Sequence, residues 1–112
     1  MNQTAQQANA DLTTDPDPPH KGNNTFRVKL TAGDGKPVSG AQVTVTFFMA
    51  AMPGMGMAEM KTPVILNDTG NGMYEGRGEL GSGGTWQVTI VARQNGQVVV
   101  NRQMTISATG GM

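Results

Sequence analysis

The residues of this chain that are best suited to chemistry are five methionines clustered near its middle. They lie in the segment Phe-Phe-Met-Ala-Ala-Met-Pro-Gly-Met-Gly-Met-Ala-Glu-Met, which covers residues 47–60. A thioether is soft and neutral and has no proton to lose near physiological pH, so it favours Cu(I) and Ag(I) over zinc, magnesium or calcium. It also keeps its affinity in acid, where histidine and cysteine ligands become protonated. The segment therefore predicts a soft-metal site.

No single helix or strand would gather these sulfur atoms. On a helix they would spread over about 200°, which is wider than an ordinary buried face, and the proline and glycines of the segment would break it. On one strand, three would face one way and two the other. We therefore expect a flexible loop over residues 49–60 that lets them converge. The central ligands of this hypothesis are Met52, Met55 and Met57, and Met49 and Met60 lie at the ends as a fourth ligand or as core residues.

Two interpretations without metal remain open for the same methionines. Methionine is an adaptable apolar residue, so the loop could be a contact surface for a partner protein, or its side chains could simply pack. A partner contact would tolerate Met55→Leu and Met57→Leu, because leucine keeps the bulk and lacks only the sulfur. Trp86 could lie over a soft cation, but it is in phase with Val88 and Ile90, and this pattern favours the core.

Composition excludes most other kinds of function. The chain has 112 residues, eight Lys plus Arg against eight Asp plus Glu, one His and no Cys. Balanced charge gives no electrostatic footprint for nucleic acid or an anionic membrane. Without cysteine there is no disulfide, thiolate site or cysteine nucleophile. No apolar run approaches the roughly 20 residues of a membrane helix, and no apolar segment of a secretory signal follows Met1. We find no catalytic constellation and expect a protein that is not an enzyme.

Alternating apolar and polar residues predict an all-β fold. The alternation covers residues 26–31, 41–47, 86–90 and 98–106, with a short apolar run at 64–66 and a glycine-containing strand at 73–80. Turn sequences separate these runs, and Asn95-Gly96 is a strong signal for a two-residue hairpin. No segment has helical periodicity. We expect an immunoglobulin-like antiparallel β-sandwich of six or seven strands.

The two ends of the chain differ in composition from this patterned region. Residues 1–22 are rich in Asn, Gln, Thr, Asp and Pro. Such a segment buries too little apolar surface to offset its ordering entropy. We therefore expect a disordered tail or linker over 1–22, a β-sandwich domain over 23–108 and a disordered C-terminus over 109–112.

Several segments resemble the YtkA-like (FixH-like) domain family, of the kind attached to copper and silver efflux adaptors related to CusB. They are Asn24 to Leu30, Gly35-Lys36-Pro37-Val38-Ser39-Gly40-Ala41-Gln42-Val43, the Met-Pro-Gly-Met loop within 47–60, Gly72-Met73-Tyr74-Glu75-Gly76 and Gly83-Gly84-Thr85-Trp86-Gln87-Val88. The resemblance covers residues 24–107 and implies soft-metal ligands at Met52, Met55 and Met57, with Met49 and Met60 nearby. Many members have His near the end of this loop, and this chain has none there, which leaves Cu(I) or Ag(I) rather than Cu(II).

The resemblance also implies a setting for the chain. We expect a bacterial periplasmic or otherwise extracytoplasmic module that binds Cu(I) or Ag(I) in copper or silver efflux. Its expected partners are periplasmic adaptor or efflux pump components, or another metallochaperone, and we expect neither nucleic-acid binding nor membrane insertion. The alternative is a non-catalytic immunoglobulin-like docking domain whose methionine loop contacts a protein without metal.

Overall fold

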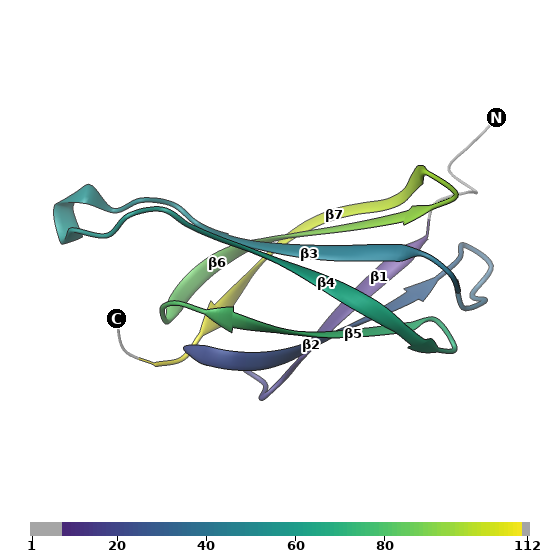
Figure 1. The fold of residues 1–112 in the computed structure, drawn as a ribbon, viewed down its shortest axis with the longest axis horizontal. Coiled ribbons are helices and arrows are strands. Elements are labelled where there is room, and N and C mark those ends of the chain that lie inside the picture. The colour runs from purple at the N-terminus through teal and green to yellow at the C-terminus, as the bar shows by residue number, and fades with distance from the viewer. Residues whose placement is uncertain (1–7, 111–112) are drawn as a thin grey trace.

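The computed structural model describes residues 8–110, which form seven antiparallel strands (Figure 1). Their spatial order is β1-β2-β5-β4-β3-β6-β7 in a single sheet that curls until its two edges approach each other. Within the described residues there is no α-helix, and no helix is long and apolar enough to span a membrane. The strands are β1 Asn9–Asp15, β2 Gly22–Thr31, β3 Gln42–Met49, β4 Met60–Gly70, β5 Met73–Leu80, β6 Gly84–Gln94 and β7 Gln97–Ala108.

Strand β4 connects the two halves of the sheet. Its first part, residues 60–66, pairs with β3, whereas Asn67 and the residues after it pair with β5. One half is therefore β1-β2-β5-β4 and the other is β4-β3-β6-β7, and the two halves enclose the core between them. This confirms the predicted immunoglobulin-like antiparallel sandwich, closed into a nearly complete barrel.

The core follows from the alternation seen in the sequence. Every second residue of β2, β3 and β6 faces inward and is buried, because successive strand side chains point to opposite faces. Phe26 and Phe47 pack against each other across the two halves, with ring centroids 4.4 Å apart and ring planes tilted by 37°. Trp86 is fully buried, and its indole N–H donates to the carbonyl of Ser82 at 3.1 Å. The prediction that Trp86 belongs to the core is confirmed.

Tight turns join the strands where asparagine precedes glycine. Asn95 and Gly96, between β6 and β7, have φ angles of 54° and 78°, and Asn71 and Gly72, between β4 and β5, have 56° and 79°. Positive φ at both central residues is the signature of the two-residue hairpin turn that matches strand twist. The Asn95-Gly96 hairpin is as predicted. The Asn71-Gly72 turn is shorter than the interval between the predicted apolar run at 64–66 and the predicted strand at 73–80, because β4 continues to Gly70.

Two glycines let β4 cross closely over β5. A Cβ atom at Gly76 would lie 2.6 Å from Leu66 Cδ2 and 2.7 Å from the carbonyl oxygen of Ile65, and one at Gly78 would lie 2.6 Å from Val64 Cγ2. Any larger residue would push the two strands apart. The glycines within β5 thus permit β4 to pass from one half of the sheet to the other.

Tyr74 anchors the connection between β2 and β3. Its ring is buried, its hydroxyl donates to the carbonyl of Val38 at 2.8 Å, and it accepts from the N–H of Ala41 at 3.1 Å. Burial raises the pKa of the Tyr74 hydroxyl above its ordinary value. The group therefore stays protonated and able to donate at physiological pH.

Asp68 holds the same connection from the end of β4. Its carboxylate accepts from the N–H of Gly40 at 2.9 Å and from the N–H of Gly70 at 2.8 Å. These two hydrogen bonds favour the ionised form and lower the pKa of Asp68 below its ordinary value.

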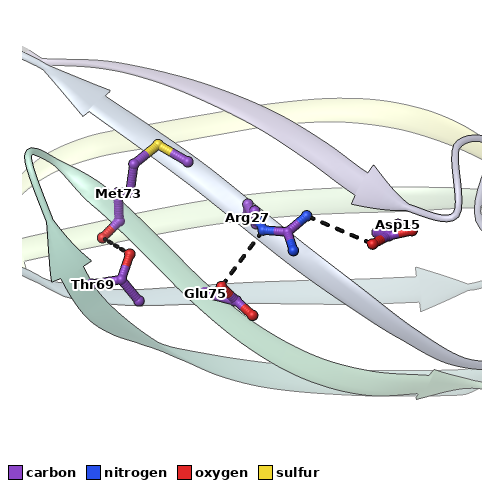
Figure 2. Close-up of polar contacts among 5 residues, drawn as sticks. All are labelled: Asp15, Arg27, Thr69, Met73 and Glu75. Carbon is purple, nitrogen blue, oxygen red and sulfur yellow. Dashed lines mark hydrogen bonds and ion pairs between the residues drawn. The ribbon is translucent and has the colours of Figure 1, made fainter.

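Polar contacts tie β1, β2 and β5 together on the outer face of their half (Figure 2). Arg27 lies between Asp15, at 3.9 Å, and Glu75, at 3.5 Å. The hydroxyl of Thr69 donates to the carbonyl of Met73 at 3.2 Å, which closes the β4–β5 turn. Because the charged side chains are largely exposed, we expect each pair to contribute less than about 1 kcal/mol.

The prediction of a disordered tail over 1–22 is wrong for the part of it that the structure describes. Residues 9–15 form β1, which pairs with β2 from Asn9↔Thr31 to Asp15↔Thr25. The inward residues of β1 are Ala10, Leu12 and Thr14, so its apolar alternation is weak, and pairing along its whole length makes up for the small apolar area. Thr109 also pairs, through backbone hydrogen bonds with Pro19 and Lys21. Residues 1–7 and 111–112 lie outside the described region.

Candidate metal centre at the methionine hairpin

Strands β3 and β4 continue past the body of the sheet as a projecting hairpin, which Figure 1 shows in teal. We call residues 49–60 the methionine hairpin. Its register places Met49 opposite Met60, and an isolated bridge nearer the tip places Met52 opposite Met57. Four of the five predicted ligands thus form two cross-strand pairs.

The tip of the hairpin is closed by four backbone hydrogen bonds. Met52 and Met57 exchange both of theirs, at 2.8 and 3.0 Å, and the N–H groups of Met55 and Gly56 donate to the carbonyls of Met52 and Pro53. The sequence explains this geometry: Pro53 starts the 3-10 turn η2 (Pro53–Met55), and Gly56 ends it at φ 70°, in the left-handed region. Both features suit a reversal of the chain at this point.

The reciprocal hydrogen bonds set how the Met52 and Met57 side chains lie. Directly opposed residues on antiparallel strands project to the same face, with Cβ atoms about 5.5 Å apart in a hydrogen-bonded pair. Each sulfur lies two bonds beyond its Cβ, so rotation about χ1 and χ2 can bring two thioethers to a common point. The backbone does not have to move for this to happen.

Exposure differs along the hairpin. Met49 is 4% exposed and belongs to the core, whereas Met55 is 59% exposed at the tip. Met52, Met57 and Met60 are half-buried and pack against the core cluster. The pair Met52 and Met57 therefore combines partial shielding with access from solvent, and the exposed Met55 adjoins it as a third thioether.

The second cross-strand pair, Met49 and Met60, lies against the glycine-rich turn between β5 and β6. A Cβ atom at Gly81 would lie 3.1 Å from the sulfur of Met60, and one at Gly84 would lie 3.4 Å from the methyl carbon of Met49. This turn is the Gly-Ser-Gly-Gly run at residues 81–84. Its glycines make room for the two thioethers, and four glycines or serines in a row are the only signal that could have suggested this.

The structure corrects the expected means of gathering the methionines. Because neither a single helix nor a single strand would gather the sulfur atoms, the sequence predicts a flexible loop. The segment is instead an ordered hairpin in which the chain reverses at residues 53–56. Two methionines an odd number of residues apart point to opposite faces of a single strand. They point to the same face when the chain reverses between them and they become cross-strand partners, so regular structure does pair these residues.

Thioethers are the donors on which any metal site here depends. Among residues 8–110, no three His, Asp or Glu side chains lie together as a group that could hold an ion. Glu59 is the only charged residue of the hairpin. A donor set of neutral sulfur suits a soft monovalent cation and suits hard divalent cations poorly, so the residues present fit Cu(I) or Ag(I).

A family profile described as YtkA-like matches residues 2–91. The chain belongs to the YtkA-like family. The matched region contains the whole methionine hairpin and ends within β6, so β7 of this YtkA-like chain lies beyond it. Searches of curated proteins and of solved structures gave no match.

Proposed function

We propose that this YtkA-like chain is a non-catalytic, extracytoplasmic module that binds Cu(I) or Ag(I) through the tip of the methionine hairpin. Met52 and Met57 are the principal ligands, Met55 is the third, and Met49 and Met60 form a secondary pair closer to the core. The observation that carries the proposal is the reciprocal hydrogen-bonded pairing of Met52 with Met57 at a projecting tip.

The setting of the module is part of the same proposal. Neutral thioethers retain affinity at low pH and cannot form disulfides, which suits an oxidising compartment such as the bacterial periplasm. An accessible tip suits exchange of the ion with a second protein. We propose that this protein is an efflux adaptor, a pump component or another metallochaperone.

The test is titration of the protein, labelled with ¹³C at the methionine methyl groups, with Ag(I) and, under anaerobic conditions, with Cu(I). We expect the methyl signals of Met52, Met55 and Met57 to shift at micromolar metal, while those of Met73 and Met104 stay in place. Changing Met52 and Met57 together to leucine should weaken binding by about tenfold or more, which is about 1.4 kcal/mol. Met104→Leu on β7 is the matched control and should leave affinity unchanged. Shifts that are equal at all methionines would refute the site.

A docking function without metal is the second candidate, and the exposure of Met55 at the end of a projecting hairpin favours it. The leucine variants separate the two functions. A docking tip keeps its partner affinity in Met55→Leu and Met57→Leu, because the apolar bulk is retained, whereas a thioether site loses its metal.

A further inference from the structure

Strands β1 and β7, the two edges of the sheet, run side by side in the same direction without forming a ladder. Within the described chain, backbone hydrogen bonds join them only near their ends, between Ala8 and Val99 at 3.2 Å and between Thr109 and the residues that follow β1. Elsewhere nearly all Cα atoms of the two strands lie more than 8 Å apart. By comparison, two strands that have a third strand hydrogen-bonded between them lie about 9.5 Å apart in any sheet. We call this gap, between residues 9–18 and 100–108, the seam.

The seam leaves part of the core uncovered. Leu12 of β1 and Met104 and Ile106 of β7 occupy inward positions, yet they are only half-buried, whereas the inward residues of the central strands are almost fully buried. A groove of about 360 Å³ lies over these three residues. Toward the other end of the seam the Arg102 guanidinium bridges the gap, donating to the carbonyl of Ala10 at 2.6 Å. The groove is therefore apolar at its base and bounded at both ends.

Backbone hydrogen-bonding groups face this groove from both sides. On β7, both the N–H and the C=O of Thr109 point toward β1, and because these groups alternate between the two edges of a strand, those of Gln103, Thr105 and Ser107 point the same way. On β1, the N–H of Ala8 and the carbonyl of Ala10 point toward β7, so those of Leu12 and Thr14 do as well. A ligand that fills the groove must satisfy donors and acceptors at strand spacing on two sides.

We propose that the seam is a docking groove for an extended peptide segment of a partner protein, which inserts between β1 and β7 as an eighth strand. Because β1 and β7 run in the same direction, one inserted strand can be antiparallel to both, which is the more stable pairing. Residues 103–108 offer six positions, a length of about 20 Å at 3.4 Å per residue. The segment therefore has about six residues, with alternate apolar side chains over Leu12, Met104 and Ile106.

Charge at one end of the groove fixes the orientation of this peptide. Asp17 lines the groove near its closed end at Thr109, and among the described residues no cationic group lies within 4 Å of its carboxylate. Asp15, by contrast, lies beside Arg27 (Figure 2). An antiparallel peptide begins at the Asp17 end, so its first residue is basic.

The test uses the ¹⁵N-labelled full chain and the synthetic peptide acetyl-Lys-Val-Thr-Val-Thr-Val-amide. We expect the amide signals of Leu12, Thr14, Gln103, Thr105 and Ser107 to shift on titration and their hydrogen exchange to slow by about tenfold or more. A peptide with Glu in place of Lys should bind about threefold more weakly. A peptide with N-methylated valines should not bind, because it lacks the donors that the groove requires.

Protein variants provide the second arm of the test. Met104→Lys places a charge in the groove and should abolish peptide binding, whereas Ile65→Lys, at a position on β4 that is 74% exposed, is the matched control and should bind normally. If Met104→Lys does not fold, the N-methylated peptide still decides the question. Absence of amide shifts at millimolar peptide, shifts confined to another face, or concentration-dependent self-association through the seam in place of peptide binding would each overturn the proposal.

Discussion

The close crossing of β4 over β5 makes the stability of this fold sensitive to a single methyl group. At Gly76 an added Cβ would overlap both a side-chain carbon at 2.6 Å and the backbone carbonyl oxygen of Ile65 at 2.7 Å. A backbone oxygen inside a paired strand cannot turn aside as a side chain can. The change Gly76→Ala should therefore force β4 away from β5, at the point where β4 passes between the two halves of the sheet.

The expected loss for Gly76→Ala is about 3 kcal/mol, the upper part of the range for overpacked sites. In a domain of this size it corresponds to a fall in melting temperature of roughly 12–20 °C. The assay is urea unfolding followed by the fluorescence of Trp86, the only tryptophan and a fully buried one. At Gly78 the nearest atom is the Val64 methyl at 2.6 Å, which belongs to a side chain, so Gly78→Ala should cost less, about 1–2 kcal/mol.

Gly54 in the hairpin turn is the matched control. A Cβ there meets nothing within 4 Å and its φ is not positive, so Gly54→Ala should be neutral or stabilise by up to about 1 kcal/mol through the unfolded state. We expect the loss of stability on substitution by alanine to increase in the order Gly54, Gly78, Gly76. If Gly76→Ala and Gly54→Ala unfold at the same urea concentration, β4 does not approach β5 as described.

Three further changes test individual polar anchors. Tyr74→Phe should lower the free energy of unfolding by about 2 kcal/mol, because two backbone partners lose the hydroxyl; an unchanged urea midpoint would contradict this. Asp68→Asn tests pH dependence. Because hydrogen bonds lower the pKa of Asp68, the stabilisation by its carboxylate is complete above the ordinary aspartate pKa and is lost as pH falls through the lowered value. In thermal melts, the melting temperature of the variant should therefore fall less steeply with decreasing pH than that of the unchanged protein. Asn24→Ala removes a 3% exposed amide that bonds the backbone of residues 20 and 22 and should cost about 2–3 kcal/mol in urea unfolding; a loss below about 0.5 kcal/mol would argue against these bonds.

The sequence predicts those parts of the fold that local patterns encode. Alternation at residues 26–31 and 86–90 predicts the inward faces of β2 and β6, and the Asn95-Gly96 pair predicts its turn. The strand over residues 9–15 is not predictable in the same way. Its inward side carries Ala10, Leu12 and Thr14, a weak apolar signal, and its stability comes from pairing with β2, a contact between segments that alternation within either one does not specify.

The methionine site shows the same limit. The residue types and the turn residues Pro53 and Gly56 point to a soft-metal hypothesis and to a place where the chain bends. Which methionines face each other depends on the register of β3 against β4, and that register follows from where the chain reverses. Once the reversal is fixed at 53–56, the pairs Met52 with Met57 and Met49 with Met60 follow by counting outward.

The four hydrogen bonds that close the hairpin tip have a consequence for the entropy of the proposed metal binding. Ordering a flexible six-residue loop around a ligand would cost about 1–2 kcal/mol per residue in backbone conformational entropy. Here the backbone of residues 52–57 is already fixed, so only the methionine rotamers remain to be restricted, at no more than about 2 kcal/mol each. The hairpin is thus preorganised, and most of its entropy loss occurs on folding rather than on the proposed binding of the metal ion.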